Sequence, residues 1–164
     1  MYVGTLIVLM LIFPMASIAL EVFVQDHGVL AVAIVGKWFV FWAVGVRLFI
    51  AGLRQIVQPR YTAETILGVK DPDATLIVRE LGFANTAIGS AGLGSLYLAG
   101  WVLPVAVIGA IFYGLAGINH VTRGGRNTLQ NVAMTSDFFA AAVLLIFCLV
   151  TTAVSTPATP YCRP

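Results

Sequence analysis

The sequence predicts an all-α integral membrane protein with five transmembrane helices. Hydrophobic residues make up 60 % of the 164 residues. Charged residues make up only 10 %, whereas soluble domains contain roughly a quarter. The charges also leave three long stretches without any charge, at 1–20, 81–122 and 138–162. This composition excludes an ordinary soluble enzyme and a disordered chain, and the net charge of +2 is too small for binding nucleic acid.

The uncharged stretches set the number of crossings. A helix needs about 20 apolar residues to span a bilayer. The stretches 1–20 and 138–162 therefore hold one helix each, and 81–122 is long enough for two. The turn between those two is marked by Gly100, Trp101 and Pro104, since Trp favours the membrane interface and Pro fits a first helical turn.

A further span is expected within 29–57, although this segment carries three basic residues. We place the span at 36–57, and a longer, tilted helix from Gly28 is the alternative. The five expected spans are residues 2–22, 36–57, 77–98, 102–121 and 137–155.

The two ends of the chain are expected to differ. Residues 1–20 lack the basic start of a signal peptide, so we expect a true span, kinked near Pro14. Residues 1–155 form a single transmembrane helical-bundle domain, and the proline-containing residues 156–164 form an irregular tail. Cys148 falls inside the last span and Cys162 in the tail, so no internal disulfide is expected.

The connection 58–76 contains several helix signals. Pro59 ends the second helix, because a residue that precedes proline avoids the helical region. Residues 62–68 can form a short interfacial helix. Asp71-Pro72 is typical of a helix start, so the third helix is expected from about residue 72.

Basic residues predict the orientation. With five spans, the loops after spans two and four share a side with the N-terminus. That side carries most of the basic residues, namely Arg54, Arg60, Lys70, Arg79, Arg123 and Arg126, whereas the other side has Lys37 and Arg163. Because cytoplasmic loops are enriched in Lys and Arg, we expect the N-terminus in the cytoplasm and the C-terminus outside.

Small residues form stripes along four of the helices, and such stripes let membrane helices pack closely. The expected inward stripes comprise Gly36, Arg47, Ala51, Arg54 and Gln58; Glu80, Ala84, Ala87, Ala91 and Gly94; Ala106, Gly109, Tyr113, Ala116, Gly117 and His120; and Asp137, Ala141, Leu144, Cys148, Thr151 and Ser155. Span one has no comparable stripe. We therefore expect spans two to five to form a four-helix core, with span one peripheral.

Arg47 is the most informative residue, since it lies about 15 Å into its span, near the bilayer midplane. A charge there is costly unless it finds water or a partner. Either Arg47 locks two helices together, held by carbonyls, Asn85 or Tyr113, or it binds an anionic or carbonyl-bearing ligand. On the second interpretation, Arg47→Leu impairs ligand binding and leaves expression largely intact.

A second group of ionisable residues is expected at the cytoplasmic mouth of the bundle, formed by Arg54, Glu80, His120 and Asp137. This group has three alternative interpretations. It is a salt-bridge ring, a proton-handling or ligand-binding vestibule, or a metal site at Glu80, His120 and Asp137. Their spacing matches no dedicated metal-ligand pattern, so no metal is predicted. Together with Arg47, Asn85 and Tyr113, these four residues are the candidate ligand-binding set, and no catalytic residue is identified.

Several segments resemble a known group of proteins. They are Lys37–Leu48 (KWFVFWAVGVRL), Gln55–Leu67 (QIVQPRYTAETIL), Arg79–Asn85 (RELGFAN), Ala116–His120 (AGINH) and Ala133–Asp137 (AMTSD). They resemble an uncharacterised family of small bacterial multi-span membrane proteins and, more distantly, the DoxX-like four-helix membrane proteins. The resemblance covers roughly 37–140 and implies a four-helix core. It implies quinone-linked redox chemistry only by analogy of fold, because no catalytic motif matches.

Three functions follow from these patterns. The first is an accessory or small-molecule-binding bundle with an intramembrane polar pocket around Arg47. The second is a quinone-linked redox protein, with quinone as its cofactor, and the third is a small transporter or channel. The expected partners are the lipid bilayer and a larger membrane complex or further copies of this chain. The lack of an identifiable catalytic motif favours a protein that is not an enzyme.

Overall fold

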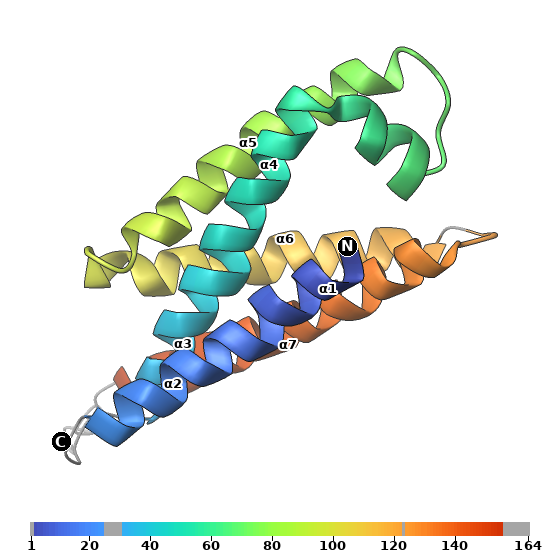
Figure 1. The fold of residues 1–164 in the computed structure, drawn as a ribbon. Helices are drawn as coiled ribbons and strands as arrows, with labels where there is room; N and C mark the ends of the chain where they lie inside the picture. The colour runs from blue at the N-terminus through green and yellow to red at the C-terminus, as the bar shows by residue number, and fades with distance from the viewer. Residues whose placement is uncertain (1, 25–30, 123, 156–164) are drawn as a thin grey trace, which may run out of the picture.

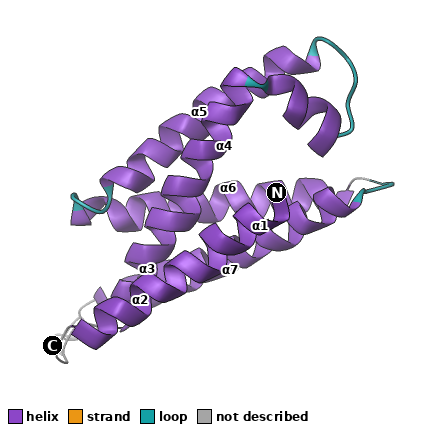
Figure 2. Cartoon of the chain, viewed as in Figure 1, coloured by secondary structure: helices purple, strands orange, loops and turns teal. Residues whose placement is uncertain are grey.

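The computed structural model describes residues 2–24, 31–122 and 124–155, and these residues form helices joined by short turns (Figures 1 and 2). No strand occurs in these ranges, which confirms the all-α prediction for them. Four of the described helices are long and apolar enough to cross a membrane: Val3–Val24, Ala31–Val57, Ala99–Thr122 and Thr128–Val154. The expected tail 156–164 and Cys162 lie outside the described residues.

The first two helical rods each contain a π-helical turn. The first rod runs through α1 (Tyr2–Ile7), η1 (Val8–Ile12) and α2 (Phe13–Val24). The π-helical η1 lies just before Pro14, whose missing N–H interrupts the regular α-helical bonding. The second rod runs through α3 (Ala31–Phe39), η2 (Val40–Val46) and α4 (Arg47–Val57). This rod begins before the expected residue 36, which agrees better with the alternative of a longer helix from Gly28. It ends before Pro59, as predicted.

The connection to the third rod follows the sequence signals closely. A short π-helix, η3 (Tyr61–Ile66), precedes α5 (Ala74–Gly94). The Asp71 carboxylate accepts the backbone N–H of Asp73 at 2.9 Å, which fixes the turn before α5. α5 ends at Gly94 instead of the expected residue 98, because the bonding changes there to i→i−3 turns, with the Leu96 N–H donating to Leu93 O at 3.3 Å and the Tyr97 N–H to Gly94 O at 3.0 Å.

The last two rods are antiparallel neighbours. The short 3-10 turn η4 (Ala99–Trp101) leads into α6 (Val102–Thr122), with Pro104 in its first turn as predicted. α7 (Thr128–Ser155) begins well before the expected residue 137. A reciprocal cap starts it, since the Gln130 N–H donates to Asn127 Oδ1 at 2.8 Å and the Asn127 N–H donates to Gln130 Oε1 at 3.1 Å. This Asn-x-x-Gln signal was missed in the sequence.

The rods are arranged as two closely packed pairs (Figure 1). α4 lies beside α5, and α6 lies beside α7. The two pairs diverge toward the end of the molecule where α1 begins and η3 lies, and the first rod runs along α3 and α7. The residues that line a cavity come from both pairs and from η3.

Glycines bring the second rod and α5 into backbone contact. A Cβ on Gly92 would lie 2.5 Å from the N and Cα atoms of Gly45, and a Cβ on Gly89 would lie 2.4 Å from Phe49 N. Neither glycine could carry a side chain without moving the helices apart. The buried residues of α5 are Val78, Gly82, Asn85, Gly89 and Gly92.

The predicted stripe on α5 was therefore wrong. Glu80, Ala84 and Ala87 are exposed, and Ala91 and Gly94 are only partly buried. The physical reason is that backbone-to-backbone packing needs residues without a Cβ, which the other face of α5 supplies. In the second rod Gly36 is buried as expected, but Arg54 and Gln58 are exposed, and Leu48, Gly52 and Gln55 face inward instead.

The predicted stripes on α6 and α7 fit better. Ala106, Gly109, Tyr113 and Gly117 of α6 are buried. On α7, Asp137, Leu144 and Cys148 are buried. Four of these residues, Ala106, Tyr113, Leu144 and Cys148, belong to the main core together with Phe39, Val40 and Val44, so the helix pairs are joined through α6, α7 and the second rod.

The first rod is attached at both ends. Leu6 and Met10 belong to the main core cluster. At the far end, the Glu21 carboxylate accepts hydrogen bonds from Lys37 Nζ at 2.8 Å and from Trp38 Nε1 at 2.6 Å. Much of the remaining surface of this rod is exposed, and Phe23 is 92 % exposed.

Candidate functional site

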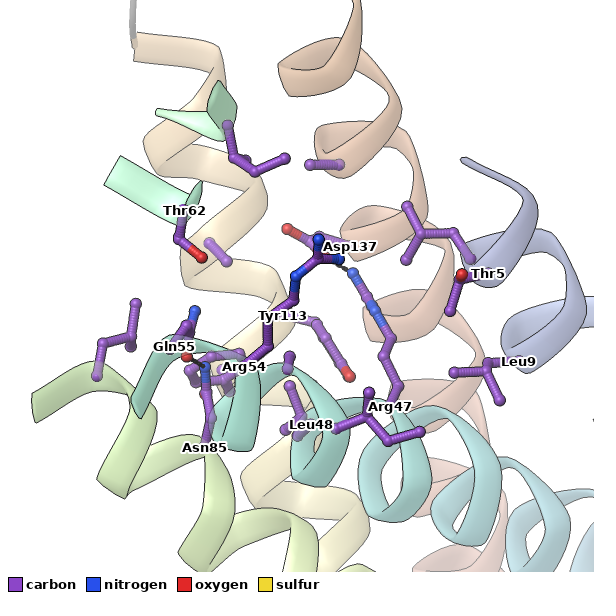
Figure 3. Close-up of a pocket in the computed structure, with 18 of the residues that line it drawn as sticks. Thr5, Leu9, Arg47, Leu48, Arg54, Gln55, Thr62, Asn85, Tyr113 and Asp137 are labelled. Carbon is purple, nitrogen blue, oxygen red and sulfur yellow. Dashed lines mark hydrogen bonds and ion pairs between the residues drawn. The ribbon is translucent and has the colours of Figure 1, made fainter. Parts of the chain in front are cut away.

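A polar cavity of about 240 Å³ lies between the two helix pairs (Figure 3). Residues of α1, α4, η3, α5, α6 and α7 line it. Its polar side chains belong to Thr5, Arg47, Arg54, Gln55, Tyr61, Thr62, Asn85, Tyr113, His120 and Asp137. The other lining residues are apolar, so the cavity combines a cluster of polar groups with a largely hydrocarbon wall.

A buried ion pair joins the second rod to α7 across this cavity. Arg47 Nη2 lies 2.8 Å from Asp137 Oδ1 (Figure 3). The same nitrogen also donates to Ser136 Oγ at 3.2 Å. The two charged side chains are only 11 % and 7 % exposed. A partner of opposite charge is what a cation inside a membrane span requires, and here it comes from a helix far away in the sequence.

Tyr113 of α6 supports the same ion pair. The Arg47 guanidinium lies 4.7 Å from the centre of the Tyr113 ring, within the range of a cation–π contact. The Tyr113 hydroxyl donates to the backbone oxygen of Ala43 in η2. Tyr113 therefore holds both the Arg47 side chain and the π-helical turn that precedes it.

His120 lies beside the ion pair on α6. Its Nε2 atom is 4.0 Å from Asp137 Oδ2. Its Nδ1 atom is buried and has no hydrogen-bond partner among the described residues.

A buried amide pair joins α4 to α5 on the opposite wall. Asn85 Nδ2 donates to Gln55 Oε1 at 2.8 Å (Figure 3). Asn85 is 3 % exposed, and its Oδ1 atom has no hydrogen-bond partner within the described parts of the chain. Buried acceptors are normally satisfied, so this oxygen is an exception that calls for an explanation.

The segment η3 covers the end of the cavity. Its Tyr61 ring stacks with the Arg54 guanidinium, whose carbon lies 3.7 Å from the ring centre. The segment is also tied to α7, because Gln130 Nε2 donates to Leu67 O at 3.1 Å. Tyr61, Thr62, Ile66 and Leu67 thus form a wall that bridges the diverging pairs.

The structure brings together most of the candidate residues named from the sequence. Arg47, Arg54, Asn85, Tyr113, His120 and Asp137 all line the cavity. Glu80 does not, because it lies on the exposed face of α5. No group of three His, Cys, Asp or Glu side chains that could hold a metal ion occurs among the described residues.

The partners of Arg47 differ in part from those expected. Tyr113 contacts Arg47 as one expectation had it, but Asn85 pairs with Gln55 instead. The principal partner is Asp137, which was expected at the cytoplasmic mouth together with Arg54 and not beside Arg47. This pairing favours the interpretation in which Arg47 locks two helices.

Sequence reasoning missed four of the polar residues that line the cavity, namely Thr5, Gln55, Tyr61 and Thr62. It also missed Ser136 and Gln130, which contact Arg47 and Leu67 without lining the cavity. Gln55 is separated from Arg47 by about two helical turns of α4, and this spacing could have identified it. The roles of Tyr61 and Gln130 depend on how η3 folds back, for which the sequence contains no signal.

Comparison with protein-family models, with curated proteins and with solved structures finds no match to this chain. The resemblance to the DoxX-like proteins is therefore neither supported nor contradicted.

Proposed function

We propose that the protein is a small polytopic membrane protein that binds a small molecule in the polar cavity around Arg47. The observation that carries this proposal is the cavity itself: about 240 Å³ of space whose polar groups converge from all five rods and from η3 between apolar walls. Ligand sites are typically apolar cavities with a few convergent polar groups. Such a bundle serves either on its own or as an accessory subunit of a larger membrane complex.

We further propose that α5 is the fifth span and that the chain lies in a bacterial inner membrane with its N-terminus in the cytoplasm. α5 has 21 residues, which is about 31 Å of helix and matches the hydrocarbon core. Arg79, Glu80 and Asn85 lower its hydropathy. Two features favour a membrane position for α5: its glycine contact with the second rod and the exposed apolar side chains Ile77 and Phe83. The first rod then packs against the bundle through Leu6 and Met10, which belong to the main core cluster.

The charges of the site suit a neutral or weakly polar ligand. Arg47 and Asp137 neutralise each other, so the cavity presents dipoles and hydrogen-bonding atoms more than net charge. Leu6, Leu9 and Leu48 supply apolar surface beside these groups. An amphipathic molecule fits these surroundings, with its polar end at the side-chain amides of Gln55 and Asn85 and its apolar part along the leucines.

The experiment that tests the proposal fills the cavity with a larger side chain. Ala116 lines the cavity, and Ala142 on α7 is exposed. We expect Ala116→Leu to reduce the amount of small molecule that co-purifies in mild detergent by about tenfold, because the added side chain occupies ligand volume. Ala142→Leu adds the same volume outside the site and is the matched control. Native mass spectrometry of the purified proteins measures the bound molecule.

Two results would contradict the proposal. One is a wild-type protein that carries no small molecule in lipid nanodiscs as well as in detergent. The other is a co-purifying molecule whose amount falls equally in both variants, which would place it on the outer surface.

A quinone is a second candidate for the bound molecule. His120 and Asp137 lie 4.0 Å apart within the cavity, and a histidine and a carboxylate are groups that exchange protons at a redox-active ring. A quinone in the lipid extract of wild-type protein, reduced in amount by Ala116→Leu, would select this candidate over a non-redox ligand.

A further inference from the structure

We infer that the ligand is a neutral amphiphile with a hydroxyl group, and that this hydroxyl donates its hydrogen bond to Asn85 Oδ1. The inference rests on the proposed function, because it specifies what the same cavity binds. It departs from the expectation of an anionic or carbonyl-bearing ligand at Arg47.

The first argument concerns the cations of the cavity. Arg47 already donates to Asp137 Oδ1 at 2.8 Å and to Ser136 Oγ at 3.2 Å, and it faces the Tyr113 ring. An anion at Arg47 would have to displace the Asp137 carboxylate or lie beside it. Arg54 is stacked on Tyr61 and is largely exposed. The site therefore offers no uncompensated buried positive charge to an anion.

The second argument concerns Asn85. Its amide is oriented by Gln55, because Nδ2 donates to Gln55 Oε1 at 2.8 Å. That bond leaves Oδ1 as the group that the described residues do not satisfy, on a side chain that is 3 % exposed and lines the cavity. An amide oxygen can only accept, so the ligand that completes this site brings a hydrogen-bond donor.

The third argument concerns His120. Its Nδ1 atom is also buried without a partner among the described residues. A hydroxyl both donates and accepts, so it can bond this nitrogen whether or not the nitrogen carries a proton. A carbonyl-only ligand cannot bond the Asn85 oxygen, whereas a hydroxyl can.

The shape of the site limits the size of the ligand. The cavity of about 240 Å³ is smaller than typical drug-sized pockets of roughly 300–1,000 Å³, so it suits one ring or a short chain. Leu6, Leu9, Leu48 and Phe112 supply apolar surface. A hydroxylated ring and the alcohol end of a lipid share this chemistry.

The experiment compares probes that differ only in their polar group. Wild-type protein in nanodiscs is titrated with 4-ethylphenol, 4-ethylanisole and 4-ethylbenzoate, and empty nanodiscs correct for partition into lipid. Binding is measured by saturation-transfer NMR. We expect 4-ethylphenol to bind and the ether and the anion to bind at least about tenfold more weakly, since each lacks the donor. A fourth probe, 1-heptanol, tests whether a chain alcohol replaces the ring.

A pair of variants tests the assignment to Asn85. Asn85→Leu removes the acceptor while keeping the branched skeleton of the side chain, and should weaken the binding of 4-ethylphenol about tenfold. Asn119→Leu makes the same change on α6, where the side chain is exposed and outside the cavity, and should leave binding unchanged. If Asn85→Leu does not fold, the probe series on wild-type protein still decides the inference.

The failure of the inference differs from the failure of the proposed function. Equal or tighter binding of the ether or the anion overturns the inference and leaves the cavity as a binding site. If no probe binds, the inference is also overturned unless the co-purifying molecule itself carries a hydroxyl. The proposed function fails as well if, in addition, Ala116→Leu does not reduce the amount of any co-purifying molecule.

Discussion

At the scale of single residues, the structure changes the meaning of Arg47. A buried ion pair is costly to break, because removing one partner leaves the other charge uncompensated. Arg47 and Asp137 are both nearly buried and lie on different rods. The sequence predicted that Arg47 needs a partner, but no local signal connects it with a carboxylate that lies 90 residues further along the chain.

We predict that Arg47→Leu lowers the free energy of unfolding by about 3–5 kcal/mol, because Asp137 remains buried and unpaired. This differs from the expectation, based on sequence alone, that the variant would express normally. The variant Asp137→Leu should cost a similar amount, and the double variant should cost less than the sum of the two. Denaturation in detergent followed by circular dichroism measures all three.

Additive effects of the two single substitutions would contradict this prediction, since independent residues do not couple in a double-mutant cycle. Arg79→Leu is the matched control, because Arg79 is exposed on α5. It should have little effect on unfolding.

At the scale of helices, glycine decides which face of α5 packs. Both faces of α5 carry small residues, and the sequence prediction chose the alanine-rich one. Gly82, Gly89 and Gly92 face the second rod instead, and at Gly89 and Gly92 the distances are shorter than any Cβ tolerates. Helix association in membranes depends on close packing, so residues without a side chain outweigh a longer stripe of alanines.

We predict that Gly92→Ala lowers stability by about 1–3 kcal/mol, because the added methyl group forces two backbones apart. The Cβ would lie 2.5 Å from backbone atoms of Gly45. The matched control is Gly114→Ala on α6, where the nearest atom to a new Cβ is 4.0 Å away. Thermal unfolding of both variants in the same detergent checks the difference, and equal unfolding temperatures would refute the glycine contact.

At the scale of the whole molecule, the count of membrane crossings depends on α5. The other four rods are apolar enough to be identified as spans on composition, but α5 carries charged and amide residues. Figure 1 shows that α5 begins near the end where η3 lies and finishes at the opposite end, where α6 begins. A chain that crosses five times would have its Thr65 and Tyr97 on opposite sides of the membrane.

We predict that cysteines at these two positions react from opposite sides. Thr65 in η3 and Tyr97 in the turn after α5 are both exposed. In a background with Cys148→Ala and Cys162→Ser, Thr65→Cys should react with a membrane-impermeant maleimide only in inside-out vesicles. Tyr97→Cys should react in intact cells. Labelling of both positions from one side would contradict the fifth span and the predicted orientation.

The sequence by itself predicted the apolar, membrane-like surroundings of the chain, its all-helical class and most of its helix ends. Scarce charge and long apolar runs act locally, and so do Pro59, Asp71 and Pro104, because each changes the bonding of the few residues around it. The stripes of α6 and α7 were also predictable, since the period of a helix fixes which residues share a face.

Only the tertiary structure decided which residues meet. The pairing of Arg47 with Asp137, of Asn85 with Gln55, and of η3 with Gln130 joins separate rods. These contacts depend on the rotation and depth of each helix against its neighbours, and glycine packing between backbones sets both quantities for α5. Helical periodicity fixes a face only relative to its own axis, and the partner of that face is chosen by the packing of the whole bundle.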